Sequence, residues 1–282
     1  VLDINTRLTG EIRRDSFAAL CKHYQKCHEY ARLADNTRRD YDKWIARFCS
    51  VYGAEPVAGA DREFVLGVRD HYQDTPRAAD YAIQVLSILF AYALDRPSVY
   101  GLQTNPARNV GRLFKSDGYK QWPEDVIETF RATAYPELRW IFEGALHLGQ
   151  RPGDMVRLTW QQFDGSGFTM RQQKTGSTLY IPCHSTLATM LARMPKRHLI
   201  LFTTANGRPW TTNWLSRECG KFSQGCVMHG LRKNAASRLA EAGCSEAEIM
   251  SITGHKTSSE IRRYTAAANQ KRLAQSAVEK MR

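Results

Sequence analysis

The stretch of sequence that decides the fold spans residues 228–265 and reads MHGLRKNAASRLAEAGCSEAEIMSITGHKTSSEIRRYT. His229 and Arg232 lie three residues apart, and this spacing places both side chains on one face of a helix. Ala235 and Leu239 continue an apolar stripe along the same segment. The segment therefore predicts an amphipathic helix that holds a histidine and an arginine together.

Two further helix starts are marked within this stretch. Ser245 and Glu248 have the spacing of a capping box, and Thr257 and Glu260 repeat it. In a capping box, the first side chain accepts a hydrogen bond from the backbone three residues on, and the acidic side chain binds back to the first residue. The pattern predicts one helix after each capping residue.

Upstream of this stretch, the sequence changes to short β-prone runs. The three runs, at 160–163, 167–172 and 178–182, are separated by turn sequences rich in Gly, Ser, Asp and Lys. We expect a small antiparallel sheet in which Lys174 lies at a hairpin tip, free to reach a ligand. The predicted fold class is mainly α with a small antiparallel β-sheet (α+β).

The first half of the chain shows helical periodicity. Apolar residues recur at three- and four-residue intervals in four segments, and four helices in about 100 residues make a compact bundle. The four segments lie at 17–33, between a cap at Asn36 or Thr37 and Gly53, after a cap at Asp61, and at 76–94.

The helical pattern stops before the middle of the chain. Asn105-Pro106 breaks it, and Lys-Ser-Asp-Gly at 115–118 is typical of an exposed linker. The predicted organisation is an N-terminal tail or remnant at 1–14, a helical bundle at 15–112, a linker at 113–122 and a second domain at 123–282.

Charge points to a polyanionic partner. The 282 residues carry a formal net charge of +12. Residues 1–118 hold 17 basic and 15 acidic side chains, whereas residues 119–282 hold 23 and 13. An excess concentrated in one half is typical of a nucleic-acid-binding surface. No apolar run is long enough to predict a membrane span, so we expect no membrane partner.

The sequence lacks the motifs that several classes of site require. Seven cysteines without a Cys-x-x-Cys pair disfavour a disulfide scaffold and a zinc ribbon, and they suit a reducing cytoplasm. The sequence has no His-x-x-x-His, no paired acidic cluster and no glycine-rich phosphate loop, so we expect no metal and no cofactor. Breaking a phosphodiester would then require a side-chain nucleophile and side-chain cations.

These residues together resemble the tyrosine recombinases, the phage-integrase family. The pattern His-x-x-Arg, a later Gly-His and a tyrosine nine residues after that histidine resemble the C-terminal signature of the family. Gly-Gln-Arg-Pro-Gly-Asp at 149–154 resembles its first arginine motif. The matching positions are Arg151, Asp154, Lys174, His229, Arg232, His255 and Tyr264.

The resemblance implies a site-specific DNA recombinase, such as the integrase of a mobile element, that needs neither metal nor ATP. Tyr264 is the implied nucleophile, which forms a 3′-phosphotyrosine. The two arginines would clamp the phosphate and His255 would donate a hydrogen bond to it. His229 would take the phenol proton, Lys174 would protonate the leaving oxygen, and Asp154 would orient the arginine and histidine side chains.

The resemblance also implies partners. The helical first half is similar to the core-binding domain of the family, so the expected ligand is double-stranded DNA, in the cytoplasm at the nucleoid. A homotetramer would form on paired DNA sites, with room for a DNA-bending accessory protein. One apolar stripe of the last segment would dock on a neighbouring subunit: Ala266, Leu273, Ala274, Ala277, Val278 and Met281.

Two other classes explain part of the sequence. Residues 235–264, with Gly243 between helices, could form the helix-turn-helix of a DNA-binding regulator. A catalytically inactive relative that binds DNA is the other. The regulator leaves Arg151, Asp154 and Lys174 unexplained, and the intact catalytic positions weigh against the inactive relative. Because many integrases carry an additional arm-binding domain and this chain begins with Val1, we also expect the sequence to be a fragment or a processed chain.

Overall fold

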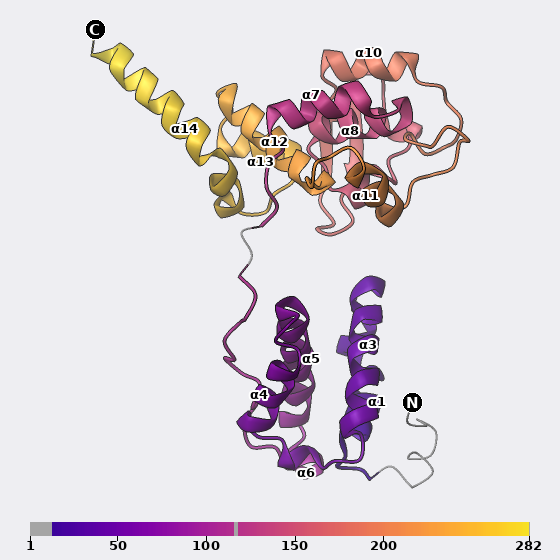
Figure 1. Ribbon diagram of the computed structural model, residues 1–282, viewed down its shortest axis with the longest axis vertical. Helices are drawn as coiled ribbons and strands as arrows, with labels where there is room; N and C mark the ends of the chain where they lie inside the picture. Colours follow the sequence, from indigo (N-terminus) through magenta and orange to yellow (C-terminus); the bar gives the residue numbers. More distant parts are fainter. Residues whose placement is uncertain (1–12, 116–117, 282) are drawn as a thin grey trace. The chain divides into compact units, whose positions relative to one another are not determined.

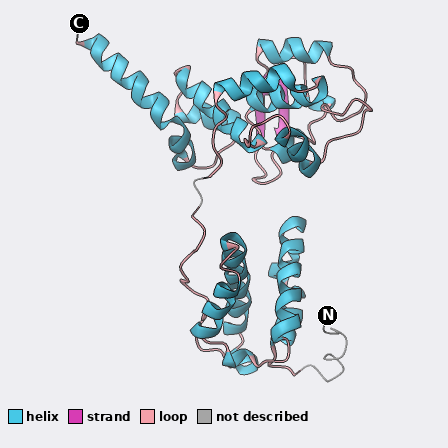
Figure 2. Cartoon of the chain, in the orientation of Figure 1, coloured by secondary structure: helices cyan, strands magenta, loops and turns pink. Residues whose placement is uncertain are grey.

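The computed structural model describes residues 13–115 and 118–281, apart from some side chains of the last helix. The chain divides into two compact units, Val1–Ser116 and Asp117–Arg282. The division falls inside the predicted linker at 113–122. Most of the described chain is helical, and one two-stranded antiparallel sheet lies in the second unit (Figures 1 and 2). The predicted fold class is therefore confirmed.

The first unit is a helical bundle built around α5. Pro76 begins α5 with its fixed backbone angle, and the helix runs to Leu94 as predicted. One face of α5 is buried against α1, α3 and α4. The elements are α1 (Phe17–Gln25), α2 (His28–Ala31), α3 (Asp35–Tyr52), η1 (Val57–Gly59), α4 (Arg62–His71), α5 (Pro76–Leu94) and α6 (Pro97–Tyr100).

Local capping corrects two of the predicted boundaries. The predicted helix at 17–33 is two helices, because Cys27 leaves the helical conformation and its Sγ accepts a hydrogen bond from the Tyr30 N–H to start α2. Neither Asn36 nor Thr37 caps α3, which begins at Asp35 after Ala34. The predicted cap at Asp61 is confirmed by its hydrogen bond from the Phe64 N–H.

The second unit packs its helices around α8, which contacts α10, α11 and α12. Its core is apolar and includes a stacked pair of rings, Phe130 and Phe142. The elements are α7 (Glu124–Thr133), α8 (Pro136–Leu148), α9 (Pro152–Met155), η2 (Trp160–Gln162), β1 (Gly167–Arg171), β2 (Thr178–Pro182), α10 (Ser185–Arg193), α11 (Thr212–Gly220), α12 (Met228–Glu241), α13 (Glu246–Thr253) and α14 (Ser258–Lys280).

The sheet is smaller than predicted. β1 and β2 pair antiparallel with Gly167 opposite Pro182 and Arg171 opposite Thr178. The run at 160–163 was predicted as a strand, and this prediction is wrong. Thr159 and Gln162 form a capping box there, so the chain turns through the short helix η2 and only Phe163 forms a bridge to the sheet.

The two predicted capping boxes have different outcomes. Ser245 and Glu248 form theirs at the start of α13. Thr257 is the N-cap of α14, so the predicted helix start is confirmed, but it makes no side-chain capping bond, so the predicted capping box is wrong. Glycines in the left-handed conformation end α8 and α13: Gly149 has φ +63° and Gly254 has φ +68°. These two helix ends frame the candidate site.

Candidate active site

The C-terminal ends of α8 and α13 are linked by side chains that bind their last carbonyl groups. A helix end leaves carbonyl oxygens without intrahelical partners, and these oxygens carry partial negative charge. Gln150 Nε2 donates to the Leu148 oxygen and the Ile252 oxygen, both at 2.8 Å. The segment 149–151 is thereby fixed next to the segment 253–255.

The side chain of Arg232 binds both of these segments. It projects from the first turns of α12 and is 2% exposed. Its Nη1 donates to the Gly149 oxygen at 3.0 Å and to the Thr253 oxygen, and its Nε donates to His255 Nε2 at 3.3 Å. The negative ends of two helices thus stabilise a buried guanidinium, which never loses its charge.

The hydrogen bonds of His255 define its ring orientation. The Thr253 hydroxyl donates to the Ile249 oxygen at 2.6 Å, so it accepts from His255 Nδ1 at 2.7 Å. His255 Nε2 is then the nitrogen that accepts from Arg232. Burial, and next the charges of Arg232 and Arg151, lower the pKa of His255 to about 3. The imidazole is therefore neutral at neutral pH.

His229 lies one turn before Arg232 on α12 and is half-buried. The exposed ring of Tyr119 packs against it, with 4.4 Å between ring centroids. Burial lowers the pKa of His229 to about 4, with further contributions from the charges of Arg232, Arg151 and Lys174. A neutral imidazole among cations can accept a proton once an anion enters the site.

Arg151 reaches the site from the loop that precedes α9. Its side chain is half-buried, and its Nη1 donates to Gln172 Oε1 at 3.1 Å. Gln172 lies directly after β1, so this bond connects the arginine loop to the hairpin. Gln172 also donates to the Thr253 oxygen that Arg232 binds, so Arg151 and Arg232 are connected through the same helix end.

The hairpin turn carries Lys174. The turn is closed by backbone bonds from the Gln172 N–H to the Ser177 oxygen and from the Gly176 N–H to the Gln172 oxygen, both 2.9 Å long. Lys174 is exposed in this turn. Asp154 is buried, and its Oδ1 accepts from the Gln173 N–H at 2.8 Å. This bond holds the residue before Lys174, whereas the predicted orientation of arginine and histidine side chains by Asp154 stays a prediction.

Tyr264 belongs to α14 by its backbone, and its side chain lies outside the described residues, as does that of Leu273. Its predicted role as nucleophile therefore rests on the sequence. The structure brings Arg151, His229, Arg232 and His255 to one place and sets the Lys174 turn next to them. Sequence reasoning missed Gln150, Gln172 and Thr253, although each lies within two residues of a predicted site residue.

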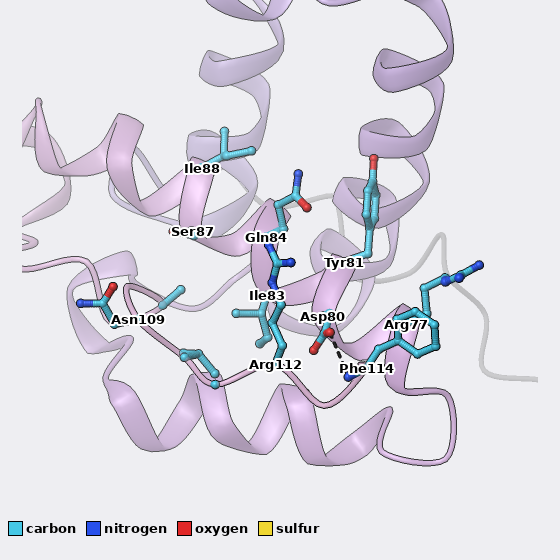
Figure 3. A pocket seen from close by; sticks show the side chains of 13 residues that line it. Arg77, Asp80, Tyr81, Ile83, Gln84, Ser87, Ile88, Asn109, Arg112 and Phe114 are labelled. Carbon is cyan, nitrogen blue, oxygen red and sulfur yellow. Dashed lines mark hydrogen bonds between the residues drawn. The ribbon is translucent and has the colours of Figure 1, made fainter. Parts of the chain in front are cut away.

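The first unit contains a separate cavity of about 580 Å³ (Figure 3). Arg77, Asp80 and Phe114 lie along one side of it, with the Arg77 guanidinium 4.5 Å from the centre of the Phe114 ring. Asp80 accepts hydrogen bonds from the Leu113 and Phe114 N–H groups at 2.8 and 3.1 Å. The first residues of the predicted linker are thus bound to α5.

The described residues contain neither a metal-binding cluster nor a membrane-spanning helix. Within residues 13–115 and 118–281, no cluster of three or more His, Cys, Asp or Glu side chains is placed to hold a metal ion. In the same part of the chain, no helix combines the length and apolar character needed to cross a membrane.

Comparison with known proteins identifies the class. The model of the phage integrase family matches residues 123–271, which cover the whole candidate site. The chain therefore belongs to the phage integrase family, the tyrosine-type site-specific recombinases, and is an enzyme of DNA recombination. A search of curated proteins gave no match.

Solved structures with the same fold include integrases of a phage and of a transposon. A lambda integrase dimer bound to a COC′ core site has a TM-score of 0.75 at 18% identity, over 89% of this chain and 77% of that one. A lambda integrase tetramer bound to a Holliday junction has a TM-score of 0.74 at 19% identity, over 87% and 79%. A Tn1549 transposon integrase with circular intermediate DNA has a TM-score of 0.71 at 16% identity, over 91% and 99%. At these identities the likeness concerns the fold.

Proposed function

We propose that this recombinase cleaves and rejoins DNA strands through a 3′-phosphotyrosine formed on Tyr264, without metal or ATP. The observation that carries the proposal is the convergence of Arg232, Arg151 and two neutral histidines on the paired ends of α8 and α13. Such a site offers fixed positive charge to a phosphate and an unprotonated imidazole to a phenol.

The proposed step conserves the number of phosphodiester bonds. The Tyr264 oxygen forms a bond to the scissile phosphorus while the bond from phosphorus to the 5′ oxygen breaks. The phenol, whose reference pKa is about 10, passes its proton to His229, and Lys174 gives a proton to the departing oxygen. The 5′ hydroxyl of the partner strand then attacks the phosphotyrosine and reverses the step.

The two arginines would neutralise the non-bridging oxygens as charge builds up on them. Arg232 is held by carbonyl groups and Arg151 by a neutral amide, so neither charge is cancelled by a carboxylate in these bonds. His255 would donate to the phosphate only with a proton on Nε2. We therefore expect His255 to take up a proton or change its tautomer when the phosphate enters.

The proposed partner is double-stranded DNA, and the proposed assembly is a homotetramer on two paired sites. The similar lambda integrase structures are a dimer on a core site and a tetramer on a Holliday junction. Figure 1 shows α14 extending away from the rest of its unit. Val278 near the end of α14 is 58% exposed and Met281 after it is 86% exposed, so this part of the predicted apolar stripe is open to a neighbouring subunit. A DNA-bending accessory protein stays a prediction.

The sequence taken alone also suited two other classes, a helix-turn-helix regulator and a catalytically inactive DNA-binding relative. Both bind duplex DNA, but neither forms a covalent bond to it. Incubating the protein with a nicked target duplex in EDTA, without nucleotide, separates these classes, because loss of the short strand beyond the nick traps a covalent intermediate. We expect a denaturant-resistant adduct with wild-type protein and none with Tyr264→Phe.

Tyr119→Phe is the matched control for this experiment. Tyr119 is a described, exposed tyrosine that touches a site residue, which makes it a rival nucleophile. The Tyr119→Phe variant should form the adduct as wild type does. Binding without an adduct in the wild-type protein would instead favour the regulator or the inactive relative.

A further inference from the structure

The side chain of Gln172 is wholly buried and makes four hydrogen bonds at the centre of the candidate site. Its Oε1 accepts from Arg151 Nη1 at 3.1 Å and from Thr175 Oγ1 at 2.7 Å. Its Nε2 donates to Gln150 Oε1 at 2.7 Å and to the Thr253 oxygen at 2.8 Å. One amide therefore connects the arginine loop, the hairpin turn and the end of α13.

Only one orientation of this amide satisfies its neighbours. A guanidinium can only donate and a backbone carbonyl can only accept, so Oε1 must face Arg151 and Nε2 must face Thr253. The backbone confines the amide further, because a Cβ atom on Gly254 would lie 2.6 Å from Gln172 Nε2 and Oε1. Both the direction and the position of the Gln172 side chain are thus fixed.

The neutral amide suits a cation that must act on a phosphate. A carboxylate at this position would hold Arg151 more tightly but would cancel its charge. It would also face the Gln150 oxygen and the Thr253 oxygen with no proton to donate. A glutamine directs the guanidinium and leaves its charge available.

We propose that Gln172 is a positioning residue of the recombinase, which sets the direction of the Arg151 guanidinium toward the scissile phosphate. The inference rests on the proposed function of Arg151 as a phosphate-neutralising group. Gln172 also fixes the two ends of the Lys174 turn through its backbone bonds to Ser177 and Gly176. Arg151 and the turn therefore share one buried anchor.

The test compares two substrates that differ in charge. Gln172→Met keeps the size of the side chain and removes its four hydrogen bonds. We measure single-turnover adduct formation on a nicked duplex with a normal scissile phosphate and on one with a methylphosphonate there. Loss of arginine direction should slow the first by about 100-fold, because small misplacements at a reacting centre have effects of this size. Since the methylphosphonate lacks the charge that Arg151 balances, its loss should stay under about tenfold.

Controls separate positioning from loss of structure. Gln162→Met removes the capping bonds of Gln162 with Thr159 in the same unit and should affect both substrates alike. Adding Gln172→Met to Arg151→Ala should cause no further loss on the normal substrate, since Gln172 acts through Arg151. Gln172→Asn, whose neutral amide is one methylene too short to reach both Arg151 and the Thr253 oxygen, carries the same substrate comparison if the Met variant does not fold.

Equal slowing of both substrates by Gln172→Met or Gln172→Asn, or additive losses in the double variant, would overturn the positioning role. The proposed function would be untouched by that result as long as wild-type protein forms the adduct. If the wild-type protein forms none, the proposed function fails first and independently.

Discussion

The two units differ in what they bury. Among the described residues, the first unit buries one polar or charged residue, Ser16, whereas the second unit buries thirteen. The first unit is instead held by aromatic packing, with the Phe17 ring 6.3 Å from that of Phe48 and 6.0 Å from that of Phe90. Buried polar groups cost free energy unless they are hydrogen-bonded, so a concentration of them indicates a function other than stability.

Part of the buried polar residues of the second unit lies at the paired helix ends, whereas others, such as Glu137 at the start of α8, do not. Gln150, Asp154, Gln172, Arg232 and His255 all belong to this region. Their hydrogen bonds connect segments that are 19 to 102 residues apart in the chain. The first unit thus resembles an ordinary apolar bundle. In the second unit, part of the interior is polar and fixes charged side chains.

The largest expected effect is the loss of activity when either arginine is replaced. The two replacements should differ in their effect on stability, because Arg232 is buried and Arg151 is only half-buried. Arg151→Ala and Arg232→Ala should each slow adduct formation by about 10²–10³-fold, the usual effect of removing one charge-stabilising donor. Arg232→Ala should also lower the free energy of unfolding by about 1–3 kcal/mol, because the Gly149 oxygen loses its donor. Arg151→Ala should lower it less. Urea unfolding of both variants measures this split, and equal destabilisation would contradict it.

Lys174 should show the opposite combination of effects. Because its side chain is exposed, Lys174→Ala should change the free energy of unfolding by no more than about 0.5 kcal/mol. Adduct formation should nevertheless fall by about 10²–10⁴-fold, as expected for loss of a general acid. A substrate with sulfur in place of the 5′ bridging oxygen should largely restore the rate, since a thiolate leaves without a proton. A defect unchanged by sulfur would assign Lys174 to DNA binding.

The apolar core of the first unit should respond in stability and not in chemistry. Phe90→Ala should destabilise that unit by about 3–5 kcal/mol through lost burial and the cavity left behind. Amide hydrogen exchange should accelerate in peptides from 17–94 while peptides from 123–253 stay unchanged. At saturating protein, the rate of adduct formation should remain within about twofold of wild type. Faster exchange in both units would remove the contrast between them.

The last contrast concerns pH. The pKa values of His229 and His255 are lowered to about 4 and about 3, below the ordinary value near 6.5. The unfolded chain therefore binds protons more readily than the folded one, so this contribution to stability is complete above about pH 6.5 and is lost as the pH falls toward 3–4. Tryptophan fluorescence during urea unfolding follows this loss, since five of the six tryptophans lie in the second unit.

His147 provides the control for the pH measurement. Burial lowers its pKa as well, and its ring contacts Glu143 and His184 of the same unit. His147→Asn should remove part of the pH dependence and leave adduct formation intact. Replacing both His229 and His255 by Asn should flatten the stability profile and also impair cleavage. A profile unchanged by that double replacement would contradict the buried, neutral state of these histidines.

Local signals predicted much of the fold. Pro76 and the apolar period gave α5 with its bounds, and Ser245 with Glu248 gave the start of α13. The prediction of a strand at 160–163 was wrong because Gln162 binds back to Thr159. The β-propensity of the residues gives no indication of this hydrogen bond. The spacing of His229 and Arg232 correctly placed two site residues on one helix.

The hydrogen-bond network could not be read from the sequence. Gln172 meets Gln150 and Thr253 only after the hairpin, α8 and α13 have packed, and no local period marks a glutamine as buried. Its position two residues before Lys174 was the one sequence feature that pointed to Gln172. Family motifs identify residues that act on the substrate, whereas residues that position them depend on tertiary contacts.

The central claim is most directly tested by locating the covalent bond between protein and DNA. The adduct is digested with trypsin and the DNA-linked peptide is sequenced by mass spectrometry. We expect the 3′ phosphate on the first residue of YTAAANQK, residues 264–271, which trypsin releases by cutting after Arg263 and Lys271. Linkage to the peptide SDGYK at 116–120, to any other residue, or to the 5′ end of the DNA would contradict the account.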